Sequence, residues 1–277
     1  MDRVDLHVHT TASDGTLAPR DVTSLAAMKG LKAIAITDHD TMAGLLEAGE
    51  AGELLGVTII PGIEISSDYL GEEVHVLGYF LEPTAKPLRE YISWVRSARR
   101  DRTRRCIEKL QAKGFDITFD QLSADYPDAT LGRPHIAREL MKLGVVSSVK
   151  EAFRKYLDEG RSCFVRREYI PFVNAIKLIQ ESGGVAVLAH PLQYGYSGKE
   201  LDAFVKAGAD AGATGIEILY PGYTRKDQDK LYSLAEKYTL LPTGGSDFHG
   251  ENKPDNPLGE PPVPAYMFLM LAGSQYK

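Results

Sequence analysis

The sequence of 277 residues lacks the features that mark disulfide-linked, membrane-spanning and secreted proteins. It has only two cysteines, Cys106 and Cys163, whose wide separation favours free thiols over a disulfide or a metal-binding pair. No apolar run approaches the roughly 20 residues of a membrane-spanning helix. No signal peptide is evident, and cleavage of one would remove the first histidines. We therefore expect a cytoplasmic protein that does not enter a membrane.

An excess of positive charge is also absent. The 32 Lys and Arg residues are outnumbered by 38 Asp and Glu, and the resulting net charge of −6 argues against general affinity for nucleic acid. A local basic site remains compatible with this value. The apolar (43%) and charged (25%) fractions are ordinary, so a chain of this length can bury a sizeable core as one large α/β domain or a domain with an insertion.

Two histidines near the start are the first candidates for a functional site. His7 and His9 lie two residues apart on a predicted strand at 4–8, so both imidazoles point to the same face. Asp14 follows on the next loop. A lone histidine is more often a buried structural residue, but two imidazoles and a carboxylate together are a set of metal ligands.

Buried strands and helices then alternate along the chain. Apolar runs predict further strands at 33–36, 57–60, 74–80, 185–188, 215–219 and 240–243. The intervening segments predict helices at 16–30, 42–55, 172–182, 199–211 and 225–238. This alternation predicts a mainly parallel sheet with crossover helices, either open or closed into a barrel.

The alternation is interrupted between residues 82 and 168. A long arginine-rich helix ends at Gly114, and further segments follow at 119–122, 132–138 and 149–157. We interpret 1–81 with 169–277 as the α/β domain and 82–168 as an inserted helical subdomain. A charge run on a helix is usually a solvated face, so we expect only one or two of its arginines to have a functional role.

Polar residues with metal-binding chemistry follow the predicted strands of the α/β domain. Because the C-terminal ends of parallel strands meet at one rim, we expect these side chains to lie together. Six of the seven histidines belong to this set, which a scatter of structural histidines would not produce. The candidate ligands are His7, His9, Asp14, His39, Glu64, His75, His190, Asp247 and His249.

This ligand set is too large for one ion. It suits two or three divalent ions, with Glu64 or Asp247 as a bridging carboxylate. Mixed imidazole and carboxylate ligands fit zinc, iron or manganese. Clustered divalent ions lower the pKa of a bound water and hold phosphate oxygens in line, which makes phosphoester hydrolysis the best-fitting reaction.

The motifs resemble those of the PHP (polymerase and histidinol phosphatase) family, in the same order and along nearly the whole chain. They are His7-Val8-His9 with Asp14, Thr37-Asp38-His39-Asp40, Glu64, His75, Ala189-His190-Pro191 and Ser246-Asp247-Phe248-His249. The resemblance implies a distorted (β/α)7 barrel with an inserted helical cap, a trinuclear metal centre and a metal-bound hydroxide as nucleophile.

The same resemblance distributes the ligands over three ions. One ion would take His7, His9, Glu64 and Asp247, a second Glu64, His75 and His190, and a third Asp14, His39 and His249. Candidates to assist catalysis are Asp38, His39 and His249. Asp38 and Asp40 could equally well orient His39 or cap the next helix. Glu217 lies near the same rim, where we expect a supporting or structural role.

The insert is similar to that of the nucleotide-processing branch of the family, which includes 3′,5′-nucleotide bisphosphate phosphatases and enzymes that trim RNA from the 5′ end. The resemblance implies that the insert caps the barrel and holds a phosphate that is not cleaved. Arginine suits this task because its planar fork binds phosphate through two hydrogen bonds. The candidate residues are Arg99, Arg102, Arg133 and His135.

Two of these sequence features have alternative interpretations. His135 is a lone histidine, for which a helix N-terminal or packing role is the alternative, but the resemblance favours contact with a substrate phosphate. Tyr220 or Tyr223, after the strand that carries Glu217, could stack on a base, although either is more often simply packed.

We therefore predict a metal-dependent phosphoesterase that removes the 3′-phosphate of nucleoside 3′,5′-bisphosphates and leaves the 5′-monophosphate. The alternative reaction is 5′-to-3′ trimming of short 5′-phosphorylated RNA. An alternative of another class is a non-catalytic nucleotide-binding module. Histidinol phosphate hydrolysis is disfavoured, because that substrate has one phosphate and a cationic amine whereas the insert is basic. The expected partner is a small nucleotide or short RNA, and no stable protein partner is implied.

Overall fold

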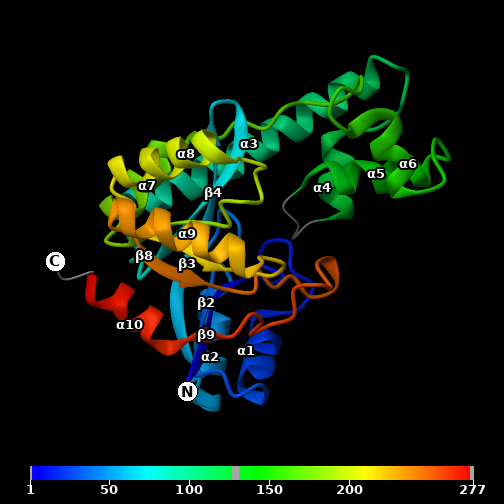
Figure 1. The fold of residues 1–277 in the computed structure, drawn as a ribbon. Coiled ribbons are helices and arrows are strands. Elements are labelled where there is room, and N and C mark those ends of the chain that lie inside the picture. Colours follow the sequence, from blue (N-terminus) through cyan, green and yellow to red (C-terminus); the bar gives the residue numbers. More distant parts are fainter. Residues whose placement is uncertain (1, 127–130, 275–277) are drawn as a thin grey trace. The chain divides into compact units, whose positions relative to one another are not determined.

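The computed structural model describes residues 2–126 and 131–274, and its contacts divide the chain into two compact units. The first unit consists of Met1–Arg89 and Tyr169–Lys277, and the second of Glu90–Glu168. The first unit contains a sheet and helices, whereas the second is helical (Figure 1). Within the described residues, no helix is both long and apolar enough to cross a membrane.

The sheet of the first unit is a nearly closed barrel. Its strands are β1 (Arg3–Val8), β2 (Ala33–Ile36), β3 (Thr58–Tyr69), β4 (Glu72–Tyr79), β5 (Ile170–Pro171), β6 (Val185–Leu188), β7 (Gly215–Leu219), β8 (Leu241–Gly244) and β9 (Val263–Pro264). Their spatial order is β8-β7-β6-β4-β3-β2-β1-β9, and β5 pairs with β3. A bridge between Val8 and Phe248 brings the chain after β8 beside β1. The predicted α/β barrel with an inserted helical region is confirmed.

Helices connect most of the strands. They are α1 (Pro19–Met28), α2 (Leu45–Leu55), α7 (Phe172–Glu181), α8 (Gly198–Asp210) and α9 (Arg225–Tyr238), with α10 (Ala265–Ser274) at the end. α1 begins at Pro19, whose fixed φ suits a first turn, and α2 ends at Gly56, whose φ of 71° permits a left-handed cap. α7, α8 and α9 lie side by side (Figure 1), and α10 packs against β1 and β8.

Both faces of the sheet are buried, as the strand β2 illustrates. Ala33 and Ala35 belong to an apolar cluster that includes residues of α10. Ile34 and Ile36 belong to a second cluster, which includes residues of α1 and α2. Side chains alternate between the faces of a strand, so a strand covered on both sides has the continuous apolar run seen at 33–36.

The prediction of a mainly parallel sheet is wrong for its centre. β3 has 12 residues instead of the four predicted, and β4 runs antiparallel to both β3 and β6. The two strands are joined at Leu70 and Gly71, whose φ values of 56° and 92° fit a tight hairpin turn. Glu64 and His75 therefore lie within this hairpin, and not at the C-terminal ends of parallel strands as predicted.

The second unit packs its helices around an apolar core of its own. It contains most of α3 (Lys86–Gln111), together with α4 (Phe119–Asp125), α5 (Arg133–Lys142), α6 (Val149–Ala152) and the π-helical turn η1 (Phe153–Leu157). Thr118 forms a capping box with Gln121 at the start of α4. Cys106 and Cys163 are free, as predicted, and buried in the core beside residues such as Leu110.

Candidate metal centre

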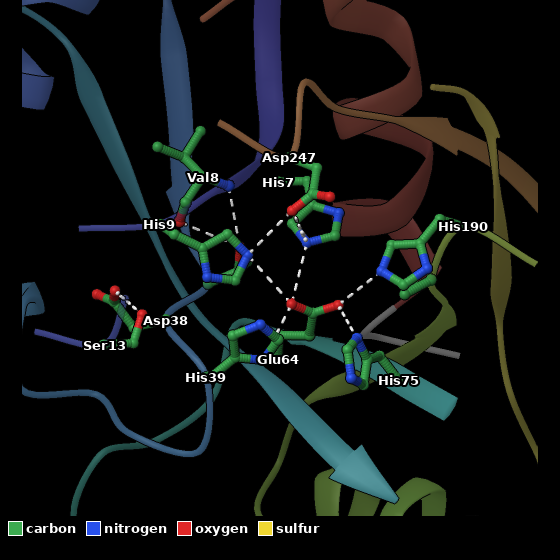
Figure 2. A network of polar contacts seen from close by, with 12 residues as sticks. His7, Val8, His9, Ser13, Asp38, His39, Glu64, His75, His190 and Asp247 are labelled. Atoms are coloured by element: carbon green, nitrogen blue, oxygen red, sulfur yellow. Dashed lines mark hydrogen bonds and ion pairs between the residues drawn. The ribbon is translucent and has the colours of Figure 1, made fainter. Parts of the chain in front are cut away.

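The nine predicted ligands all belong to the first unit, and the structure brings them together in one cluster, part of which is shown in Figure 2. They come from β1 and the loop after it, the loops after β2 and β6, the hairpin β3–β4, and the segment after β8. Most are buried. The side chains of His39 and His75 are 17% and 18% exposed, and that of Asp14 is 55% exposed. These three residues therefore mark the side of the cluster that faces solvent.

Glu64 is the hub of the cluster. Its Oε1 lies 3.0 Å from both His75 Nδ1 and His190 Nε2. Its Oε2 lies 3.3 Å from His7 Nε2 and 3.1 Å from His9 Nε2 (Figure 2). The carboxylate is fully buried, with one oxygen directed at each half of the cluster. Both oxygens of this carboxylate are therefore available as ligands for a cation.

The two oxygens of Asp247 have different kinds of partner. Its Oδ1 faces the imidazoles, at 3.5 Å from His7 Nε2 and 3.4 Å from His9 Nε2. Its Oδ2 accepts hydrogen bonds from Tyr220 Oη at 2.7 Å and from Lys253 Nζ at 2.6 Å. One oxygen is thus held by two donors, which leaves the other directed at the cluster.

Donor atoms in the cluster form three overlapping groups, within each of which they lie no more than 4.8 Å apart. The groups are His7, His9, Glu64 and Asp247; His9, Asp14, His39 and His249; and His39, Glu64 and His75. The resemblance placed His190 with Glu64 and His75. In the structure His190 contacts the same Glu64 oxygen as His75, and His39 takes its place in the compact group.

The cluster fits metal ions because its polar atoms do not satisfy one another. Among the described residues, eight buried atoms of the cluster have no hydrogen-bond partner, although many face another member at short distance. They are His7 Nε2, His9 Nδ1, His9 Nε2, His39 Nδ1, Glu64 Oε2, His75 Nδ1, His190 Nδ1 and His249 Nε2. Buried polar groups are normally paired, so a concentration of unpaired nitrogen and oxygen atoms indicates a site for cations.

In the metal-free protein, opposing effects set the charges of these groups. Burial raises the pKa of Glu64, but the surrounding imidazoles outweigh it and hold that pKa well below its usual range. Burial lowers the pKa of His75, but Glu64 and Glu73 reverse this effect and raise it to about 10. For His39, burial and repulsion from other imidazoles outweigh Glu64 and lower the pKa to about 3. Charged and neutral imidazoles therefore coexist around the carboxylates.

Asp38 and Asp40 have supporting contacts. Asp38 Oδ1 accepts hydrogen bonds from Thr10 N at 2.8 Å and Ser13 Oγ at 2.6 Å, and Oδ2 accepts one from Thr10 Oγ1 at 2.8 Å. Asp40 accepts a hydrogen bond from Ser66 N. Asp38 thus holds the loop that leads to Asp14. This role is closer to the orienting alternative than to catalysis, although the loop and not His39 is what it holds.

Several contacts of the ligands were missed by sequence reasoning. Tyr220 was considered for base stacking, but its ring is buried and its hydroxyl is bonded to Asp247. Lys253 lies six residues after Asp247 in a proline-rich segment, and no pattern in that segment pointed to it. Glu73 Oε1 lies 3.5 Å from His75 Nε2. The alternation of Glu73 and His75 along a strand was the only signal available for this contact.

The predicted phosphate-binding residues all lie in the second unit. Arg133 donates to Leu157 O at 3.1 Å, and its guanidinium lies 5.4 Å from the ring centre of Phe153. Arg102 Nε donates to Val165 O at 2.8 Å, and Arg99 lies on the same helix. His135 Nδ1 accepts a hydrogen bond from Gly132 N at the start of α5. The side chains of Arg133, Arg102 and His135 therefore support the structure of their own unit.

A nearly closed α/β barrel with a buried cluster of imidazoles and carboxylates defines a class, that of metal-dependent hydrolases. The sequence matches the PHP domain family over residues 5–167, and the chain belongs to this family. It is 34% identical over 247 residues to the 5′-3′ exoribonuclease of Haemophilus influenzae, which covers 89% of this chain and 90% of that relative.

Two further relatives cover almost the entire chain. The 3′,5′-nucleoside bisphosphate phosphatase of Chromobacterium violaceum is 31% identical, with 95% of this chain and 94% of the relative covered. A solved structure from Bifidobacterium adolescentis, described as a metal-dependent phosphoesterase, is 33% identical and superposes with a TM-score of 0.79 over 98% of this chain and 96% of its own. This protein is accordingly a metal-dependent phosphoesterase of PHP type.

Proposed function

We propose that the enzyme hydrolyses the 3′-phosphate of nucleoside 3′,5′-bisphosphates. The observation that carries the chemistry is the buried cluster of unpaired imidazole and carboxylate atoms around Glu64. The relative named as a 3′,5′-nucleoside bisphosphate phosphatase supports the choice of substrate, because the similarity extends over 95% of this chain.

In this reaction the oxygen of water forms a bond to phosphorus and the bond between phosphorus and the 3′-oxygen breaks. The 3′-oxygen takes up a proton, and the products are the 5′-monophosphate and inorganic phosphate. When bound, divalent ions lower the pKa of a coordinated water and neutralise phosphoryl oxygens. Glu64 links the halves of the cluster, while Tyr220 and Lys253 fix Asp247.

The proposal includes three divalent ions, of manganese, iron or zinc, held by the nine ligands. His39 and His249 both belong to one of the compact donor groups, together with His9 and Asp14. Their part in the reaction is therefore to bind an ion. Asp38 contributes by holding Thr10 and Ser13, and hence the loop that carries Asp14.

Discrimination between bisphosphates and simple phosphate esters is assigned to the helical unit. Arg133 and His135, with Arg99 and Arg102, are proposed to bind the phosphate that is not cleaved. Arginine and phosphate form charge-assisted hydrogen bonds, which are about twice as strong as neutral ones. The contact between Arg133 and Leu157 O would fix one edge of the guanidinium during this task.

A second candidate function is 5′-to-3′ trimming of short RNA. It is favoured by the 34% identity to a relative named as a 5′-3′ exoribonuclease. The same cluster would then cleave a phosphodiester and release mononucleotides. In both functions the bond between phosphorus and a 3′-oxygen is cleaved. They differ in whether the phosphate attacked is a monoester or a diester, so their products differ: inorganic phosphate in the first case and a shortened RNA in the second.

Product analysis tests the proposal directly. Purified protein loaded with Mn²⁺ is given adenosine 3′,5′-bisphosphate and, separately, a 5′-phosphorylated oligoribonucleotide. We expect AMP and phosphate from the first substrate and an intact oligonucleotide from the second. Rapid release of mononucleotides from the oligonucleotide, with only slow hydrolysis of the bisphosphate, would replace the proposal with RNA trimming.

Adenosine 3′-monophosphate is the matched control substrate, because it has the scissile phosphate but lacks the 5′-phosphate. We expect its KM to be higher by roughly tenfold to hundredfold, since one charge-assisted contact contributes about 1.5–3 kcal/mol. Equal KM values for the two nucleotides would contradict recognition of a second phosphate.

A further inference from the structure

Glu217 is a fully buried carboxylate of the barrel whose two oxygens contact two different ligands of the candidate metal centre. It lies on β7, where the pairing with β8 is irregular between Glu217 and Leu219. Such an irregularity changes the direction of side chains and is common beside active sites. The side chain of Glu217 reaches β1 and the end of β6, which are far apart in the sequence.

The first oxygen of Glu217 sets the state of the His7 ring. Glu217 Oε1 lies 3.1 Å from His7 Nδ1, so a proton on Nδ1 donates to it. When the ring is neutral, the other nitrogen, Nε2, then has its lone pair directed at the cluster, where it lies 3.3 Å from Glu64 Oε2. This Nε2 is one of the buried atoms without a hydrogen-bond partner among the described residues. A carboxylate thus selects the tautomer that can bind a cation.

The second oxygen of Glu217 fixes the backbone of His190. Glu217 Oε2 accepts a hydrogen bond from His190 N at 2.8 Å. His190 has a φ of +25°, a backbone conformation that non-glycine residues rarely adopt and that surrounding contacts must maintain. From this backbone, the His190 ring lies nearly parallel to that of His7, at 5.6 Å and 14°, and its Nε2 faces Glu64 Oε1.

We propose that Glu217 is a positioning residue that organises two metal ligands at once. It holds His7 as the Nδ1-protonated tautomer and it holds His190 in a strained backbone conformation, so that both present Nε2 to the two oxygens of Glu64 (Figure 2). Among the described residues, the hydrogen bonds of the Glu217 carboxylate are those to His7 and His190. The inference rests on the metal dependence of the family and is independent of the substrate.

Replacement of Glu217 by glutamine tests this role with almost no change in shape. Glutamine has one acceptor oxygen where glutamate has two, so either the His7 Nδ1–H or the His190 N–H loses its partner. We expect Glu217→Gln to lower the affinity for Zn²⁺, measured by competition with a chelator, by about tenfold to hundredfold. An affinity equal to that of the wild-type protein would overturn the proposal.

Nuclear magnetic resonance of the Zn²⁺-loaded proteins distinguishes positioning of the ligands from a purely structural role of Glu217. In the wild type we expect a slowly exchanging proton on His7 Nδ1, assigned by its loss in His7→Asn, and a protected amide at His190. In Glu217→Gln at least one of these two protons should exchange faster. Unchanged exchange of both protons, whatever the stability of the variant, would show that Glu217 does not position the ligands.

Asp5 provides the matched control. It is also a fully buried carboxylate of the barrel, but its backbone donors are His7 N, Ser246 N and Gly259 N, and none of these is a ring nitrogen of a ligand. Asp5→Asn should therefore lower the melting temperature without exposing the His7 Nδ1 proton. If Glu217→Gln does not fold, the wild-type spectrum still decides the question. Coordination of Zn²⁺ by His7 Nδ1, with the proton on Nε2, would contradict the proposal.

Discussion

The two units use their charged residues in opposite ways. The first unit has 15 Lys and Arg residues against 26 Asp and Glu, a net charge of −11, and directs the buried carboxylates of Glu64, Glu217 and Asp247 at a cluster of six imidazoles. The second unit has 17 against 12, a net charge of +5, and places arginines on its own backbone carbonyls and aromatic rings. The first unit therefore gathers its potential metal ligands in one place, whereas the second distributes its positive charge over its helices.

This difference shows which charged side chains are held for function by the fold itself. In the first unit, atoms without a hydrogen-bond partner, such as His9 Nε2 and Glu64 Oε2, lie 3.1 Å from each other in a buried space. That arrangement is costly unless a cation is bound. In the second unit, Arg133 and Arg102 have contacts that would stabilise the helices without any ligand. Their proposed role in binding phosphate is therefore tested by experiments that compare substrates.

The largest effect is expected for His9→Ala, because His9 belongs to two of the three donor groups. Turnover should be abolished, and the content of bound metal should fall. The loss of metal affinity should exceed the factor of about 10 to 100 that loss of a supporting partner costs. Elemental analysis of the dialysed protein measures the metal. His135→Ala, which removes the one histidine outside the cluster, should leave the metal content unchanged. Full activity of His9→Ala would refute the ligand assignment.

The independence of the two units is tested by Leu110→Ala in the core of the second unit, where Leu110 is fully buried. The cavity should destabilise this unit by about 2–5 kcal/mol, measured by denaturant unfolding, while the metal content of the protein stays the same. Leu143→Ala, at a half-exposed position of the same unit, should change stability by less than about 0.5 kcal/mol. Loss of metal in Leu110→Ala would show that the second unit supports the metal centre.

The proposed role of the second unit is tested by Arg133→Ala. We expect KM for adenosine 3′,5′-bisphosphate to rise by roughly tenfold to hundredfold, and KM for a singly phosphorylated aryl ester to change little. Arg161→Ala, at an exposed position of the same unit, is the control for general charge. Equal changes for both substrates would eliminate Arg133 from phosphate recognition and leave it with its structural contacts.

The smallest effect is expected for Tyr220→Phe. The substitution removes one of the two donors to Asp247 Oδ2 and leaves Lys253 in place. Metal affinity should fall by no more than about tenfold. Tyr223→Phe is the matched control. The Tyr223 hydroxyl accepts a hydrogen bond from Leu192 N, whereas the Tyr220 hydroxyl donates one to the candidate ligand Asp247. A similar loss of affinity in both variants would contradict a specific role of Tyr220.

The sequence was most informative where chemistry and periodicity coincide. His7 and His9 alternate on β1, and the buried run at 33–36 is a strand of the same length in the structure. Glu64 and His75 were identified by their residue types, yet their hairpin was not predicted. The predicted strand ended at residue 60, before Pro61 and Gly62, whereas both of these residues lie within β3.

The contacts that complete the site come from long-range packing, which local patterns do not encode. Glu217 contacts His7 across 210 residues, and Ser246 N donates to Asp5 across 241 residues. Lys253 reaches Asp247 because the chain turns back after His249. In the second unit, a run of arginines looks the same in the sequence whether a side chain binds a ligand, a carbonyl oxygen or water.

The central claim, that the cluster around Glu64 is the metal centre of this phosphoesterase, is tested most directly by anomalous X-ray scattering from crystals of the Mn²⁺-loaded protein. The account predicts strong peaks within the donor groups, with at least two of the ions in contact with the oxygens of Glu64. Peaks that lie elsewhere, with the cluster empty at saturating Mn²⁺, would contradict it.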